Sequence, residues 1–323
     1  KDAFVVPIEE EKVFFRKKKE LAMGTKSDHL VLAEALTRWE AENETNGGWR
    51  FTREYYLSPN TLSMLKDMKK QFAHHLHDMR FLSTSYVKDR ASNRNSHNIG
   101  LIKAIICAGL YPNVAIVKNV KRNKKGEIKQ RIFTPEDGPV SLHIRSINSN
   151  EPFFEGRFLV YHLKMKTSKV FLHDTTMVFA LALIFFGHNF ELFKENGMVV
   201  IELSPKIRFT CATSTALLVK ELRQRLDQLL EYKVAHPGVT DWDQSSDEGK
   251  LLRAIAELIS HDDQQHEDEQ LSMVEESDED EDDDDDEDFP DYTEDRYSRS
   301  SSNSYRSGYG RASTSGVTPF PRF

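Results

Sequence analysis

Cysteine is nearly absent from this chain, whose 323 residues contain only Cys107 and Cys211. Two thiols cannot supply the disulfide framework of a small secreted domain, and no Cys-x-x-Cys pair is present to begin a zinc site. Both cysteines sit among apolar neighbours, so we expect buried, reduced thiols. This scarcity predicts a protein of a reducing compartment, cytoplasmic and/or nuclear.

Long apolar runs are also missing. The longest run, Val178–Phe186, is far shorter than the roughly 20 residues that cross a bilayer as a helix. Residues 1–20 lack the apolar core of a signal peptide. We therefore expect a soluble protein with no membrane partner.

The short motifs of common enzyme classes are absent as well. The sequence contains no GxxxxGK[ST] phosphate-binding loop, no GxSxG and no HExxH. His74, His75 and His77 are spaced so that at most two share a helix face, which favours a partly solvated face over a zinc site. The Asp28-His29 pair has no third member to complete a triad, which favours a structural pair. The sequence itself shows no catalytic residue, no metal site and no cofactor site.

What is present is a strong segregation of charge. Residues 261–323 contain 21 Asp and Glu against 5 Arg, whereas residues 1–260 contain 31 acidic against 39 basic residues. The net charge of −8 for the whole chain therefore combines a basic body with a strongly acidic tail. A basic body of this kind is suited to contact phosphate groups.

The first part of the chain has helical apolar spacing. Ser27 or Asp28 can cap one helix, and Ser58 followed by Pro59 supplies the cap and first residue of another. Residues 83–98 predict a polar loop, and a third helix follows from Ile99. The helix after Ser58 is predicted to carry one buried stripe, formed by Leu62, Leu65, Met68, Phe72, Leu76 and Met79.

The pattern changes at Tyr111-Pro112 to short strand-like runs separated by Gly and Pro. Five or more such strands over 113–210 predict a small β-barrel, with Val178–Phe186 ambiguous between strand and buried helix. Helical spacing returns at 213–232 and 251–259. From residue 261 onward the chain is acidic and then rich in Ser, Tyr and Arg, which predicts disorder. The predicted fold class is α+β.

Two basic stretches within the strand region are candidate nucleic-acid contacts. The stretch 121–125 fits a solvated hairpin loop, a phosphate-contacting loop or a nuclear-import patch. Strand alternation would place Lys164, Lys166 and Ser168 on one face, which suits a phosphodiester backbone as well as a solvated edge. Phe153, Phe154, Phe158 and Tyr161 could stack on bases, although core positions are favoured for most. The predicted binding residues are Lys121, Arg122, Lys124, Lys125, Arg145, Lys164, Lys166, Thr167 and Ser168.

Several runs resemble the C-terminal third of the DEAH-box (DEAH/RHA) RNA helicases, and within that family the RHAU branch, which unwinds G-quadruplexes. These runs are Lys1-Asp-Ala-Phe-Val-Val-Pro7, Ser27-Asp-His-Leu30, Tyr56-Leu-Ser-Pro-Asn-Thr-Leu62, Gly109-Leu-Tyr-Pro-Asn-Val-Ala115 and Tyr161-His-Leu-Lys-Met-Lys-Thr-Ser168. The likeness covers about residues 1–260 in the same order. The chain departs from the family at Ala3, at His143-Ile144 and at Val178-Phe179-Ala180, where the family usually has proline.

The resemblance implies a domain order. It places the end of a linker or helical segment at 1–27, a helical ratchet (HA2-like) domain at 28–112, an OB-fold at 113–210, C-terminal helices at 211–260 and a disordered tail at 261–323. It also implies that two motor domains, which bind ATP and Mg²⁺, precede Lys1, so that this piece binds no cofactor and is inactive alone.

The resemblance implies a function in nucleic-acid binding. In the family, the ratchet and OB domains close over the motor and form part of the channel for single-stranded RNA. The expected partners are single-stranded RNA or DNA, G-quadruplexes and the motor domains in cis. A rival hypothesis is a protein-interaction or regulatory module whose acidic tail recruits a basic partner.

Overall fold

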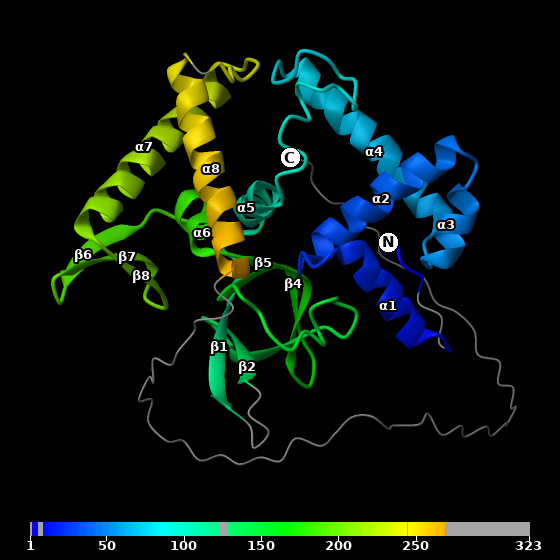
Figure 1. Cartoon of the computed structure of the whole chain (residues 1–323), viewed down its shortest axis with the longest axis horizontal. Helices are drawn as coiled ribbons and strands as arrows, with labels where there is room; N and C mark the ends of the chain where they lie inside the picture. The colour runs from blue at the N-terminus through cyan, green and yellow to red at the C-terminus, as the bar shows by residue number, and fades with distance from the viewer. Residues whose placement is uncertain (1, 6–8, 123–127, 244, 269–323) are drawn as a thin grey trace, which may run out of the picture. The chain divides into compact units, whose positions relative to one another are not determined.

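A computed structural model describes residues 2–5, 9–122, 128–243 and 245–268 (Figure 1). The chain begins with helices and continues into a barrel, a second small sheet and two long helices. Within the described ranges, none of the helices combines the length and apolar character that spanning a bilayer requires. The helices that precede the barrel are α1 (Glu11–Ala22), α2 (Asp28–Glu44), α3 (Gly48–Glu54), α4 (Pro59–Asp78) and α5 (Ile99–Leu110).

Three of these helices begin at side-chain caps. Ser27 Oγ accepts the Leu30 N–H at 3.1 Å at the start of α2, and Ser58 Oγ accepts the Thr61 N–H at 3.3 Å at the start of α4. Asn98 Oδ1 caps α5 in the same way through the Leu101 N–H, at 3.0 Å. Each cap satisfies a backbone N–H that has no partner inside its helix. The starts predicted at Ser27 and at Ser58-Pro59 are confirmed.

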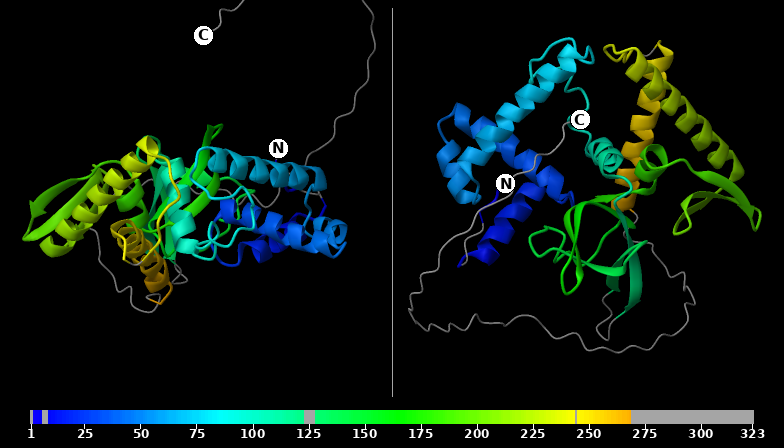
Figure 2. Two further views of the ribbon diagram at one scale, coloured as in Figure 1. Left: turned by 90° about the horizontal axis from the view of Figure 1, so that it is seen from above. Right: turned by 180° about the vertical axis from the view of Figure 1, so that it is seen from behind.

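The helical segment has its own core, and α4 enters it only through its first turns. Phe14, Trp39, Phe51 and Leu62 are buried there. The predicted buried stripe of α4 is wrong beyond this point, because α2 and α3 cover only the first turns and α4 then continues past them (Figure 2). Further along the predicted stripe, the side chains are exposed: Met68, Phe72, Leu76 and Met79.

Five strands form a closed barrel in the order β1-β2-β3-β5-β4. All neighbouring pairs are antiparallel except β3 and β5, which are parallel. Strand alternation sends one set of side chains inward, including Ala115, Leu159, Tyr161 and Leu172. The strands are β1 (Val114–Arg122), β2 (Ile128–Thr134), β3 (Gly138–Leu142), β4 (Phe158–Lys166) and β5 (Val170–Val178).

The barrel is smaller than the predicted range 113–210. The ambiguous run after β5 forms a helix, α6 (Ala180–Phe186). The strands that follow, β6 (Glu191–Glu195), β7 (Met198–Ser204) and β8 (Ile207–Cys211), form a separate three-stranded antiparallel sheet. The pairing of β1 with β4 closes the barrel and leaves no free edge for later strands, so they pair with one another.

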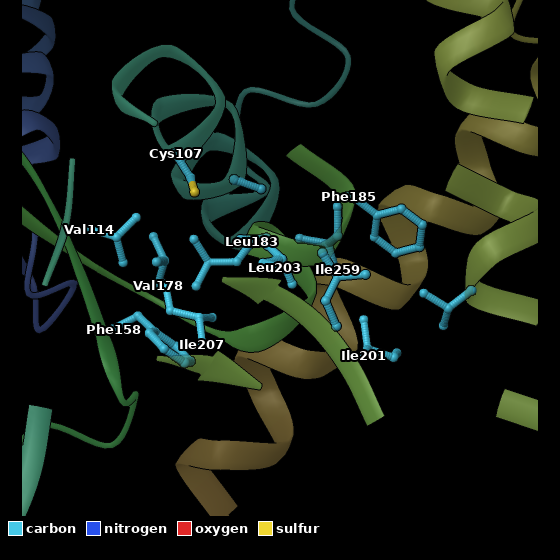
Figure 3. Packing of buried hydrophobic residues seen from close by; sticks show 14 of the residues in the cluster. Cys107, Val114, Phe158, Val178, Leu183, Phe185, Ile201, Leu203, Ile207 and Ile259 are labelled. Atoms are coloured by element: carbon cyan, nitrogen blue, oxygen red, sulfur yellow. The ribbon is translucent and has the colours of Figure 1, made fainter. Parts of the chain in front are cut away.

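The second sheet packs with α5, α6, α7 (Thr213–Ala235) and α8 (Asp247–Asp268) around a shared core. Figure 3 shows Leu183 and Phe185 of α6 beside Ile201 and Leu203 of β7 and Ile259 of α8. Cys107 of α5 is fully buried in this core, and burial raises the pKa of its thiol to about 12. Both cysteines are free thiols, but the prediction of burial holds only for Cys107, because Cys211 is half-buried at the end of β8.

Helix α8 extends past the boundary predicted for the disordered tail. It continues through Asp268, and Asp262 Oδ2 accepts the Leu181 N–H at 3.0 Å in the first turn of α6. Because Phe179, the residue before α6, provides no side-chain cap, Asp262 supplies this acceptor from another helix. The prediction that the chain cannot fold from residue 261 onward is therefore wrong for 261–268, and the rest of the predicted tail lies outside the described residues.

Candidate nucleic-acid interface

The two lysines of β4 lie on one face near the end of the strand. Phe158 and Val160 point away from the barrel interior, but Lys164 lies directly opposite Leu172 of β5, whose side chain is inside the barrel, so the alternation does not continue unbroken to Lys164. Phe158 and Val160 are covered by the core around α5 and α6, whereas Lys164 and Lys166 lie further along, where the strand is exposed. The expected placement of these two lysines on one face is confirmed.

Lys164 is held by acidic residues of the turn between β2 and β3. Its Nζ lies 2.5 Å from Asp137 Oδ2 and 3.2 Å from Glu136 Oε2. The hydrogen bond to Asp137 raises the pKa of Lys164, and the same contact lowers the pKa of Asp137. These ion pairs lie at the surface, where they contribute little free energy, so a phosphate group can compete for the ammonium.

Lys166 ends β4 and is followed by a tight turn. It is exposed and makes no ion pair within the described ranges. The Thr167 N–H donates to the Lys169 carbonyl at 2.9 Å, which closes the turn into β5. The alternation that joins Lys164 and Lys166 therefore does not extend to Ser168, which is exposed within this turn.

The structure describes the other predicted basic residues only in part. Arg145 is exposed in the turn after β3, and its carbonyl accepts a hydrogen bond from Lys18 Nζ at 2.6 Å. Lys121 and Arg122 end β1, where the structure describes only the backbone. Lys124 and Lys125 lie outside the described residues, so the role of the stretch 121–125 stays a prediction.

The aromatic residues proposed as stacking platforms are mostly core. Phe154, Phe158 and Tyr161 expose 4%, 8% and 4% of their surface. Phe154 and Tyr161 fill the barrel interior, while Phe158 packs on its outer side. Phe153 is half-buried. The core interpretation is confirmed for the three buried rings, which no base can reach.

Asp28 connects the start of α2 to the barrel through several hydrogen bonds. Its buried carboxylate accepts the Ile147 and Thr175 N–H groups, each at 2.9 Å, and the Ser146 hydroxyl at 2.5 Å. His29 Nδ1 lies 2.8 Å from Thr176 Oγ1, and burial lowers the pKa of this imidazole. Asp28 and His29 therefore each bond to groups of the barrel region and, among the described residues, share no hydrogen-bond partner, so both have structural contacts but do not form the predicted pair with one another.

The histidines of α4 do not assemble with other ligands. His74, His75 and His77 are exposed on the helix surface. In the part of the chain that the structure describes, no group of three or more His, Cys, Asp or Glu side chains is arranged to hold a metal ion.

The sequence interpretation missed a cationic surface in the helical segment. Lys66 and Lys70 of α4 and Lys88 of the following loop line one pocket together with Tyr86. The signal was present in the loop 79–98, which contains Arg80, Lys88, Arg90 and Arg94 against a single acid, Asp89. The polar residues of this segment correctly predicted a loop, but its excess of positive charge was not used in the sequence interpretation.

The barrel topology defines the class of the strand region. A closed five-stranded barrel with this strand order is an OB-fold, a scaffold that commonly binds oligonucleotides. The family model described as "Oligonucleotide/oligosaccharide-binding (OB)-fold" matches residues 102–190. A second family model, "C-terminal domain in RNA helicases", matches residues 207–261 and thus covers β8, α7 and most of α8.

Full-length relatives agree with these two matches. The chain is 42% identical over 264 residues to the ATP-dependent DNA/RNA helicase DHX36 of Bos taurus and of Homo sapiens, over 80% of this chain and 26% of each relative. It is 32% identical over 257 residues to the DExH-box ATP-dependent RNA helicase DExH1 of Arabidopsis thaliana, over 79% of this chain and 24% of that protein. The chain is homologous to the C-terminal part of DEAH-box helicases, and it spans about a quarter of the length of these relatives.

Proposed function

We propose that this chain is the nucleic-acid-binding C-terminal module of an ATP-dependent RNA/DNA helicase and that it forms part of the channel for a single strand. The observation that carries this proposal is the exposed end of β4, where an OB-fold barrel presents Lys164 and Lys166 two residues apart on one face of the strand. Ammonium groups spaced along a strand suit successive phosphates of a single-stranded backbone. The motor domains in cis are its protein partner, and they supply the ATP and Mg²⁺ chemistry.

A G-quadruplex-resolving parent is the finer part of the proposal. It is supported by the likeness to the RHAU branch and by the identity to DHX36, a relative named as a helicase of both DNA and RNA. A module that lines a single-strand channel would grip the strand after a quadruplex opens. Its lysines would then act on the unfolded strand whatever its sequence, because phosphate contacts carry no sequence information.

The test is the salt dependence of binding. The chain with Lys164→Ala and Lys166→Ala is titrated against labelled single-stranded RNA between about 50 and 200 mM salt. Removal of one phosphate-binding cation should lower the slope of log affinity against log salt by about 0.7 on a single strand. We expect weaker binding and a slope smaller by about 1.4 if each lysine contacts one phosphate.

The matched control is Lys194→Ala with Lys220→Ala. These lysines are exposed on β6 and α7, away from the barrel strands, and their removal changes net charge by the same amount. If the two double variants lose affinity equally, the effect is one of net charge, and the β4 lysines are solvated edge residues.

A further inference from the structure

A pocket of about 390 Å³ lies in the helical segment, away from the barrel strands. It is formed by the end of α2, the middle of α4 and the loop that follows α4. Helices α2 and α4 are in contact, and in the view from behind in Figure 2 they cross. Its volume lies within the range of small-molecule sites. The lining residues are Glu40, Asn43, Glu44, Lys66, Lys70, Tyr86, Val87 and Lys88.

The two acids of this pocket already have cationic partners. Glu40 Oε2 lies 2.9 Å from Lys69 Nζ, and Glu44 Oε1 lies 2.5 Å from Lys88 Nζ. The contact with Lys88 lowers the pKa of Glu44. With both carboxylates neutralised by these partners, the charge left for a ligand comes from the remaining lysines of the lining.

Lys66 and Lys70 are those lysines, and they are one helical turn apart on α4. The Lys66 ammonium lies 6.0 Å from the centroid of the Trp39 ring, and Lys70 Nζ lies 3.5 Å from Asp67 Oδ1 in an exposed pair. An exposed pair at this distance contributes little free energy. Two ammonium groups on adjacent turns can therefore accept one anionic group without breaking a buried ion pair.

Tyr86 adds an aromatic surface to this cationic site. Its side chain is 62% exposed, so a planar group can approach its ring. The next two residues of the chain, Val87 and Lys88, line the same pocket. Lysines beside an accessible aromatic ring are the combination with which proteins bind single strands, because the cations contact phosphates and the ring stacks on a base.

We propose that this pocket holds one nucleotide of a single-stranded nucleic acid, with its phosphate between Lys66 and Lys70 and its base against Tyr86. This inference rests on the proposed function and gives the helical segment a subsite of its own, separate from the β4 lysines. An acidic peptide would use the same lysines but would not require the tyrosine ring, so the ring distinguishes the two ligands.

The experiment measures binding of single-stranded RNA to the 323-residue chain and its variants. Tyr86→Ala should weaken binding about 5- to 150-fold, the range for removal of one stacked base, whereas Tyr86→Phe should keep wild-type affinity. Lys66→Gln with Lys70→Gln should weaken binding and lower the salt slope by about 0.7, the value for one phosphate. Thermal unfolding of each variant establishes that it is folded.

Two controls match these changes. Tyr232→Ala removes an aromatic ring of similar exposure on α7, and Lys194→Gln with Lys220→Gln removes the same charge elsewhere. Neither should reproduce the effect of the pocket variants. If Tyr86→Ala binds RNA as wild type does while the β4 variant Lys164→Ala with Lys166→Ala binds weakly, the subsite is wrong and the proposed function stands.

The other outcomes are equally clear. If the wild-type chain binds no RNA at low salt, both the proposed function and the subsite fail. If the pocket lysines are needed to bind poly-glutamate while Tyr86→Ala leaves RNA affinity unchanged, the pocket takes an acidic protein partner, and the nucleotide assignment is overturned.

Discussion

The Thr175 backbone N–H of β5 donates to the Asp28 carboxylate of α2 at 2.9 Å, although 147 residues separate them. The same carboxylate lies 3.6 Å from Lys18 Nζ, and both side chains are buried. Helices from the start of the chain and a barrel strand therefore share one buried ionic group.

Replacement of Asp28 should destabilise the whole described unit. Asp28→Ala leaves the Lys18 ammonium without its carboxylate and leaves the Ile147 and Thr175 N–H groups without an acceptor. We expect the free energy of unfolding to fall by about 3–5 kcal/mol, the cost of breaking a buried pair from one side. Urea unfolding measures this loss. Asp67→Ala, on the exposed surface of α4, is the control and should leave the midpoint unchanged. Equal midpoints for the two variants would contradict the role of Asp28.

Acid should weaken the contact that the turn after β3 makes with strand β5. The rings of His143 and His173 stack with centroids 3.9 Å apart, and burial, then His173 and Arg145, lower the pKa of His143. A histidine whose folded pKa is lowered takes up protons more readily in the unfolded state, so stability is highest above about pH 6.5 and falls as pH drops through the folded pKa.

The measurement is urea unfolding at pH 7.5 and pH 5.5. His143→Phe keeps an aromatic ring in the stack but cannot be protonated, so it should lose less stability than wild type between the two pH values. His97→Phe, which changes an exposed histidine of the loop after α4, should behave as wild type. An identical acid-induced loss in wild type and His143→Phe would assign the pH dependence to other groups, such as His29.

The 323-residue chain should release no phosphate from ATP. Its sequence contains neither a GxxxxGK[ST] loop, the motif that cradles nucleotide phosphates and places a hydroxyl on Mg²⁺, nor an Asp-Glu-Ala-His box. Purified chain with ATP, Mg²⁺ and RNA should give the phosphate release of a buffer blank. Catalytic turnover that survives further purification would overturn the assignment of ATP chemistry to other domains.

The acidic run of the tail should compete with nucleic acid for the basic body. Residues 275–288 are almost wholly acidic, and a tethered segment reaches effective concentrations in the millimolar range. Deletion of 275–288 should therefore increase affinity for unstructured RNA at low salt. The gain should vanish at high salt, because exposed charges are screened beyond the Debye length, about 8 Å at physiological ionic strength. Unchanged affinity at low salt would leave solubility or partner recruitment as the role of the run.

The sequence predicted elements where local chemistry decides the outcome. Ser27, Ser58 and Pro59 mark helix starts because their caps need only nearby backbone groups. Alternation in β4 likewise placed Lys164 and Lys166 correctly. What failed depends on distant partners: the stripe of α4 has the spacing of a core helix, but no described element covers Met68 or Phe72. The predicted end of the barrel was wrong for the same reason. The barrel is closed by the pairing of β1 with β4, and apolar spacing along the sequence does not show such a long-range pairing.

The Asp28 junction also has a mechanical meaning. The start of α2 is tied to β5 through Ser27, Asp28 and His29, and to the turn after β3 through Ser146 and Ile147. These hydrogen bonds connect the start of the helix rigidly to the barrel. We therefore expect a displacement of α2 to move β5 and the turn after β3 together with the helix.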